Sequence, residues 1–153
     1  MDSETLERFV VEAHRNGYAT ADADETADGL KTIEYERDEW RYVDRYAGSR
    51  DFVGFEVVHG HGDPVWGMNY YGSLADRASA APVYGFLREA LAAVSVEYPF
   101  RGPPLRGERY VYENESTGDL DGFYGSETIR EAEGDTGQKP PVYEGFYRGG
   151  LVG

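Results

Sequence analysis

The sequence carries the same short residue patterns twice and in the same order, which constrains its fold more than any single motif does. The matched sets are Phe9, Glu12, Ala13 with Phe86, Glu89, Ala90; Arg41, Tyr42, Val43 with Arg109, Tyr110, Val111; Phe52, Gly54, Glu56 with Phe123, Gly125, Glu127; and Pro64, Val65, Tyr70, Gly72, Leu74 with Pro141, Val142, Tyr147, Gly149, Leu151. Their common order favours an internal duplication, with pseudo-repeats over approximately residues 3–75 and 82–152. A duplicated chain predicts a pseudo-twofold molecule that binds a ligand where its halves meet.

Residues 1–153 are expected to form a single domain, because a unit of about 70 residues buries too little surface to be stable alone. Hydrophobic residues make up 40% of the chain and aromatic residues 14%, which excludes a disordered protein. No apolar run is long enough to span a bilayer, and the acidic start does not resemble a signal peptide. The chain has no cysteine, so disulfides and thiolate metal sites are excluded. We therefore expect a cytoplasmic protein.

The net charge of −14 argues against nucleic acid and anionic membranes as partners, because both repel an acidic surface. Only two of the 15 basic residues are lysines, Lys31 and Lys139. An acid-rich and lysine-poor composition is typical of halophilic proteins, in which salt screens the self-repulsion. The alternative is an ordinary acidic protein encoded by a GC-rich genome.

Apolar residues recur at helical spacing in two segments: Leu6, Phe9, Val10 and Ala13 in the first, and Val83, Phe86, Leu87, Ala90, Leu91 and Val94 in the second. They predict helices over Ser3–Asn16 and Pro82–Val96. Gly17 is expected to end the first helix, and His14 to lie at its exposed end.

Alternating side chains and turn residues predict strands in the rest of the chain. The predicted strands are Thr32–Arg37, Trp40–Tyr46, Asp51–His59, Val65–Tyr71, Glu108–Glu113, Phe123–Arg130 and Val142–Tyr147. Thr20–Gly29 and Glu131–Pro140 are expected as polar loops, and Tyr98–Pro104 as a linker. The predicted fold class is therefore α+β: internally duplicated helix-plus-three-strand units forming a curved antiparallel sheet of six or seven strands, with two helices packed on one face.

Glu56 and Glu127 each stand among apolar neighbours on one strand face, two residues after a glycine. The residues predicted to surround them in a groove are Tyr42, Tyr46, Trp66, Tyr70 and Tyr110, with Asn69 on the opposite face as a ligand contact or a link between strands. Carboxylates among aromatic rings suit a cationic or aromatic small molecule. The expected function is small-molecule binding.

Two alternatives remain open for the same residues. Burial would raise the pKa of Glu56 or Glu127, so that the protein could be an acid–base enzyme such as an isomerase or hydrolase. Otherwise both glutamates accept hydrogen bonds from tyrosine hydroxyls or pair with Arg41, Arg109 or Arg130. In that case the protein is structural, or forms a homodimer through a tyrosine-rich surface.

The sequence predicts neither a metal site nor a cofactor. His59 and His61 lie in a hairpin turn, and their spacing is too unspecific for a catalytic zinc, which needs three protein ligands. No serine nucleophile elbow, phosphate-binding loop or dinucleotide-binding glycine pattern is present.

The chain resembles an uncharacterised prokaryotic family of unknown function that has a W-x-M-N-Y-Y-G signature, here Trp66–Gly72. The other matching residues are Trp40, Arg41, Tyr42, Asp44, Tyr46, Phe52, Gly54, Glu56, Val57, Val58, Pro64, Val65, Arg101, Gly102, Pro103, Phe123, Gly125 and Glu127. The family has no established activity. Some of its members follow a helix-turn-helix segment, which implies a sensor-like pocket; no such segment is expected here. A looser fold-level analogy is to gyrase-inhibitor-like effector domains, which are also duplicated and hold an acidic, aromatic groove.

Overall fold

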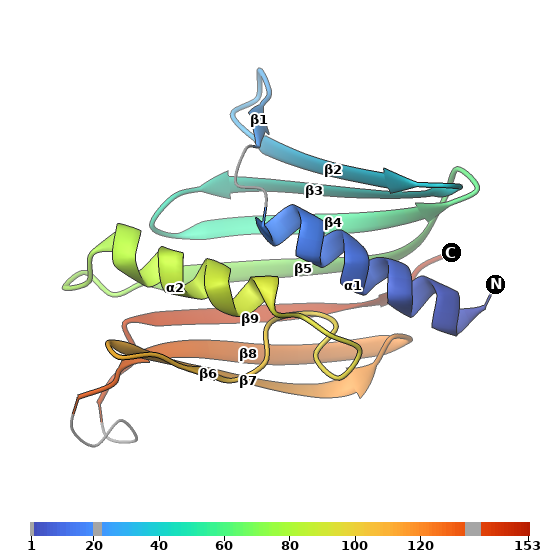
Figure 1. The fold of residues 1–153 in the computed structure, drawn as a ribbon. Coiled ribbons are helices and arrows are strands. Elements are labelled where there is room, and N and C mark those ends of the chain that lie inside the picture. The colour runs from blue at the N-terminus through green and yellow to red at the C-terminus, as the bar shows by residue number, and fades with distance from the viewer. Residues whose placement is uncertain (1, 20–22, 134–138) are drawn as a thin grey trace.

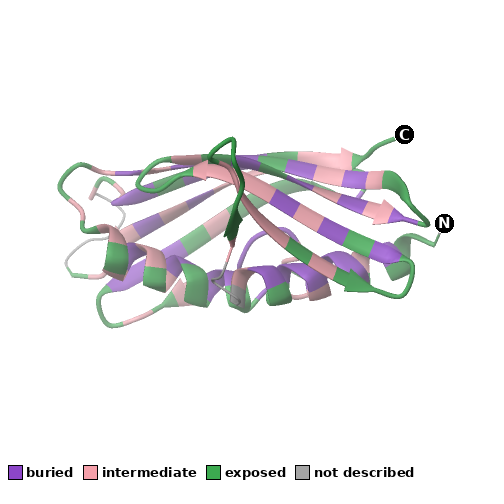
Figure 2. Cartoon of the chain, turned by 90° about the horizontal axis from the view of Figure 1, so that it is seen from above, coloured by how far each residue is buried: buried purple, intermediate pink, exposed green. Residues whose placement is uncertain are grey.

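The computed structural model describes residues 2–19, 23–133 and 139–153 (Figure 1). Its nine strands form one antiparallel sheet, in the order β1-β2-β3-β4-β5-β9-β8-β7-β6. The strands are β1 (Asp24–Glu25), β2 (Lys31–Arg37), β3 (Trp40–Gly48), β4 (Phe52–Gly60), β5 (Asp63–Leu74), β6 (Leu105–Arg106), β7 (Tyr110–Asp119), β8 (Gly122–Glu131) and β9 (Tyr143–Leu151). Helices α1 (Ser3–Ala19) and α2 (Ala80–Ala92) both cover one face of this sheet (Figures 1 and 2).

The predicted sheet of six or seven strands is therefore wrong, although the α+β class holds. The two strands without a counterpart in the prediction are β1 and β6, each of two residues. A two-residue strand is too short to show an alternating pattern, and β1 falls within the acidic segment expected as a loop. Residues 20–22 and 134–138 of the two predicted polar loops lie outside the described residues.

Helix α1 continues through Gly17 instead of ending there. A Cβ atom at Gly17 would lie 3.4 Å from Cε1 of Tyr42, so this glycine packs closely against the sheet. The expected exposure of His14 is also wrong, because its side chain is fully buried. Neither helix of the described residues has the length and apolar character needed to cross a membrane.

The helices bury their apolar stripes in two neighbouring clusters. Leu6, Phe9, Val10 and Ala13 of α1 pack against Trp40, Tyr42, Val58 and Trp66 of β3–β5. Val83, Leu87, Ala90 and Leu91 of α2 pack with Tyr110, Tyr112, Ile129 and Tyr143. Phe52 contacts both clusters, and Figure 2 shows buried and exposed residues alternating along the strands. Helix α1 thus covers strands β3–β5, and α2 covers strands β7–β9.

The sheet is joined at its centre by β5 and β9, where Tyr70 lies directly opposite Tyr147. Each tyrosine reaches over a glycine of the next strand. A Cβ atom at Gly54 would lie 2.4 Å from Oη of Tyr70, and one at Gly125 would lie 2.4 Å from Cζ of Tyr147. The matched pairs Tyr70 with Tyr147 and Gly54 with Gly125 therefore make matching contacts, and the duplication itself stays a prediction.

We predict that Gly54→Ala destabilises the protein by about 1–3 kcal/mol, because the added methyl group collides with Tyr70 and with Cβ of Tyr46. Urea unfolding measures the change. The control is Gly85→Ala in α2, where a Cβ atom meets nothing within 4 Å. That substitution should stabilise the helix by about 0.5–1 kcal/mol. Equal effects of the two substitutions would contradict the close packing of Tyr70 on Gly54.

Candidate functional site

A cavity of about 250 Å³ lies between the two helices and the sheet. We call it the helix–sheet cavity. Its lining residues come from α1, β2–β5, α2 and the segment after α2: Gly17, Tyr18, Lys31, Ile33, Asp44, Tyr46, Gly48, Ser49, Phe52, Tyr70, Tyr84, Leu87, Arg88, Leu91 and Arg101. Five of these are aromatic, and Asp44 is the one carboxylate among them.

The predicted site residues lie in several places. Tyr46 and Tyr70 line the helix–sheet cavity. Tyr42 and Trp66 are buried in the α1 cluster, and Tyr110 is buried in the α2 cluster. Glu56 and Glu127 are also buried, with 1% and 2% of their surface exposed, and neither lines the cavity. Asn69 is exposed on the other face of the sheet, as its position in the strand predicts.

Glu56 lies in a buried hydrogen-bonded group with residues of α1 and β3. The hydroxyl of Tyr42 donates to Oε2 of Glu56 at 2.9 Å, and Nε2 of His14 contacts Oε1. Nδ1 of His14 lies 2.6 Å from the carbonyl oxygen of Pro99, which can only accept, so this nitrogen carries a hydrogen. Through these contacts His14 links Glu56 to the segment after α2.

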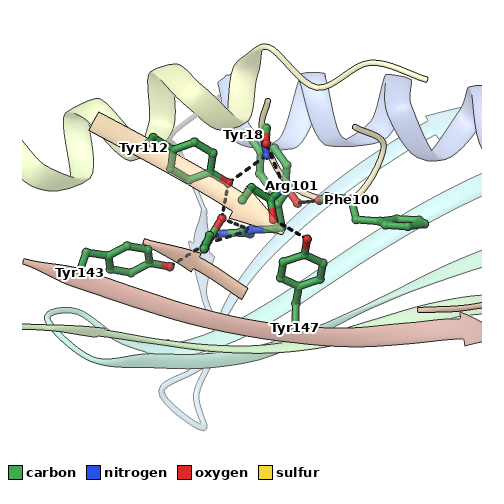
Figure 3. Close-up of polar contacts among 9 residues, drawn as sticks. Tyr18, Phe100, Arg101, Tyr112, Tyr143 and Tyr147 are labelled. Atoms are coloured by element: carbon green, nitrogen blue, oxygen red, sulfur yellow. Dashed lines mark hydrogen bonds and ion pairs between the residues drawn. The ribbon is translucent and has the colours of Figure 1, made fainter. Parts of the chain in front are cut away.

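A second buried group holds Glu127, which accepts hydrogen bonds from Arg101, Tyr112 and Tyr143 (Figure 3 labels the three donors). Nε of Arg101 donates to both carboxylate oxygens at 3.1 Å, and Nη2 donates to Oε1 at 2.6 Å. The hydroxyls of Tyr112 and Tyr143 donate to the same carboxylate at 2.5 and 2.8 Å. Burial raises the pKa of both tyrosines, so they keep these protons. The charges of Arg101 and Glu127 therefore balance each other.

Both glutamates accept hydrogen bonds from tyrosine hydroxyls, as one alternative predicts, but the arginine partners predicted for them are wrong. Arg41 pairs with Glu34 and Glu36, and Arg109 lies over the ring of Tyr110. Arg130 donates to a backbone carbonyl. The basic side chains that contact the glutamates are instead His14 of α1 and Arg101 of the segment expected as a linker.

Asp44 is the third buried acid, and the prediction missed it as a site residue. It is 5% exposed, and the hydroxyl of Tyr70 donates to its Oδ1 at 2.6 Å. Five ionisable side chains other than tyrosine are buried in the described residues: His14, Asp44, Glu56, Arg101 and Glu127. Within this set Asp44 alone has no ion-pair partner. Burial, followed by the nearby charge of Glu56, raises the pKa of Asp44 to about 7.

Asn114 occupies the corresponding place in the second half of the sheet. It follows Tyr112 by two residues on β7, as Asp44 follows Tyr42 on β3. The predicted match of Tyr42 with Tyr110 is therefore wrong by two residues, because Tyr112 makes the contact to Glu127 that Tyr42 makes to Glu56. The hydroxyl of Tyr147 donates to Oδ1 of Asn114 at 2.6 Å, the same distance as between Tyr70 and Asp44. A neutral amide is thus sufficient to hold the central tyrosine. The charge of Asp44 is not needed for that contact.

We predict that Asp44→Asn stabilises the protein at pH 8 and has little effect near pH 4. The folded state holds the Asp44 proton up to a pKa of about 7, whereas the unfolded chain releases it near the ordinary value of 3.8. Stability is therefore lost as pH rises between these values, by up to about 4 kcal/mol. Urea unfolding at both pH values measures the difference. The matched variant Asn114→Asp should lose stability at pH 8, and a destabilising Asp44→Asn at that pH would contradict the prediction.

We also predict that Glu127→Gln destabilises the protein by about 3–5 kcal/mol, because it leaves the buried guanidinium of Arg101 without a counter-charge. The control is Glu34→Gln, which removes the half-exposed partner of Arg41 and should change stability by less than about 1 kcal/mol. Chemical unfolding of the two variants at neutral pH provides the comparison. Similar losses of stability in both variants would show that the buried Arg101–Glu127 pair contributes no more than an exposed ion pair.

Comparison with known proteins gives one family match. A family described as a domain of unknown function, DUF5680, matches residues 44–152, which begins at Asp44 and includes β4 to β9. That the family shares the W-x-M-N-Y-Y-G signature, and that some of its members are fused to regulators, stay predictions. No curated protein and no solved structure matches the chain. Since the match covers more than half of the sequence, the chain belongs to the DUF5680 family.

Proposed function

We propose that the protein binds a small molecule in the helix–sheet cavity and that Asp44 contacts a cationic or hydrogen-bond-donating group of this ligand. The observation that carries the proposal is the buried carboxyl group of Asp44, which has no ion-pair partner in the described residues and lines the cavity. Because Asn114 makes the equivalent tyrosine contact without a charge, the carboxylate is available for a ligand. A bound cation would offset the cost of ionising Asp44.

The aromatic lining supports a ligand with a flat ring or an organic cation. Tyr18, Tyr46, Phe52, Tyr70 and Tyr84 surround the cavity, and aromatic ring faces attract cations. The volume of about 250 Å³ suits a small ligand of about one ring and a short chain. Glu56 and Glu127, expected at the floor of the groove, act in this proposal by holding Tyr42, Tyr112 and Tyr143 in place.

Lys31 and Arg88 add positive charge to the same cavity. Arg88 is exposed, and Lys31 is partly exposed with its Nζ 5.7 Å from the ring centroid of Tyr46. These cations would pair with an acidic group on the outer end of a ligand. The proposed ligand class is therefore a small aromatic amine, with or without a carboxylate.

Three matched compounds test the proposal: phenethylamine, phenylalanine and 3-phenylpropionate. The two compounds with an amine should raise the melting temperature of the wild-type protein, since ligands that bind only the folded state stabilise it. 3-Phenylpropionate, which lacks the amine, should have little effect. Asp44→Asn should abolish the shift, and Asn114→Asp serves as the control variant. No shift with either amine, or an equal shift in Asp44→Asn, would count against the proposal.

An acid–base enzyme is the second candidate, and the pKa of Asp44 favours it. A carboxyl group with a pKa of about 7 beside a cavity can both donate and accept protons at neutral pH. In this version the reactive acid is Asp44, because Glu56 and Glu127 are enclosed in their own pairs. Hydrolysis of small aryl esters, compared between wild type and Asp44→Asn across pH 5–9, separates the two functions. Turnover that depends on Asp44 supports the enzyme, and ligand shifts without turnover support binding.

The predicted partners follow from composition. With a net charge of −14, the protein is proposed to bind neither nucleic acid nor anionic membrane. Halophilic and cytoplasmic character, like the single-domain organisation of residues 1–153, stay predictions from the sequence.

A further inference from the structure

The face of the sheet opposite the helices carries an apolar patch at its centre. We call this the outer patch: Val53, Phe55, Tyr71, Tyr124 and Phe146, each about half exposed. These residues come from β4, β5, β9 and β8, the four central strands of the sheet, while both helices lie on the other face (Figure 1). Large apolar patches on a protein surface usually mark an interaction site.

The strand register arranges the outer patch in two adjacent rows. Cross-strand partners lie on the same face of a sheet, so each row runs across β4, β5, β9 and β8. The first row is Val53, Tyr71, Phe146 and Ser126. The second row is Phe55, Asn69, Arg148 and Tyr124. Aromatic residues occupy the centre of the first row and both ends of the second.

We infer that a second copy of this chain covers the outer patch, through a twofold axis parallel to the strands. Such an axis lays β4 of one copy on β8 of the other, and β5 on β9, with each row facing the same row reversed. Tyr71 then faces the partner's Phe146, and Phe55 faces the partner's Tyr124. Asn69 faces the partner's Arg148, so the two polar side chains of the second row also lie opposite each other. Each contact occurs twice, as a twofold interface requires.

The opposite choice of axis fits much less well. A twofold axis running across the strands would lay the first row on the second. Tyr71 would then face the partner's Asn69, and Phe146 would face the partner's Arg148. This arrangement replaces the contacts between aromatic rings at the centre of the patch by contacts between a ring and a polar side chain. The register therefore selects the axis parallel to the strands.

The patch has the size expected of an interface core. Buried aromatic side chains contribute about 150–250 Å² each, and four of the five patch residues are aromatic and half exposed. Since only about half of that area is still exposed, these four residues offer roughly 300–500 Å², and the polar border would supply the rest of the roughly 800 Å² per partner of a standard interface. Two copies with a charge of −14 each repel one another, so association should strengthen as salt screens the repulsion.

The first test is the mass in solution, measured by light scattering in dilute buffer and in molar potassium chloride. We expect twice the chain mass of 17.1 kDa at high salt. Phe146→Glu should return the protein to a monomer without lowering its melting temperature, because the side chain is 58% exposed in the single chain. Val96→Glu is the control, since Val96 is equally exposed at 59% but lies outside the patch. A monomer at all salt concentrations overturns the inference and leaves the patch to another partner, as does a dimer that Phe146→Glu leaves intact.

The second test determines the direction of the axis by cross-linking introduced cysteines. The chain has no cysteine of its own, so only the introduced residues can react. Face-to-face sheets lie about 10 Å apart, so a short bismaleimide linker can join facing residues. A mixture of Phe55→Cys and Tyr124→Cys proteins should give a cross-linked dimer that joins one of each. Efficient cross-linking of Phe55→Cys alone would instead indicate the axis across the strands and overturn the proposed geometry.

Discussion

The burial of carboxylates beneath the helices, and their compensation by cations, is the constraint on which the fold depends. Glu56 and Glu127 lie at corresponding places on β4 and β8, and each needs donors because water does not reach it. His14 of α1 contacts Glu56, and the guanidinium of Arg101, from the segment after α2, pairs with Glu127. These contacts fix the position of the helical layer on the sheet. Asp44 lacks such a cation, and this exception distinguishes the helix–sheet cavity from the rest of the interior.

The two halves use the same tyrosine contacts with different charges. Tyr70 and Tyr147 face each other across the central strand pair, each over a glycine, yet one donates to Asp44 and the other to Asn114. The helix–sheet cavity lies on the Asp44 side only. The matched residues predict a pocket between the two halves. The cavity is instead lined mainly by residues of the first half and of the two helices. This asymmetry is why the proposed ligand contacts centre on a residue that has no acidic counterpart.

Much of the fold could be predicted from the sequence, because long strands and amphipathic helices show their periodicity. The short strands β1 and β6 could not be predicted, since two residues carry no pattern. His14 had a usable signal, as it follows the buried Val10 by four residues on α1. Asp44 also had one, since it alternates with Tyr42 on the inward face of β3. No sequence signal indicated that Arg101 would be buried, because its position depends on the path of the loop after α2, which only the tertiary structure defines.

The central position of β9 has a consequence for folding. This strand is the last in chain order, yet it joins β5 to β8. Until it pairs, β1–β5 and β6–β8 remain two separate sheets, each with an open edge. Such an unpaired edge can bind the strands of other chains, and long-range pairing of this kind is slow. During synthesis the first five strands emerge long before β9, so the edge of β5 stays available for aggregation until β9 has been synthesised and has paired with it.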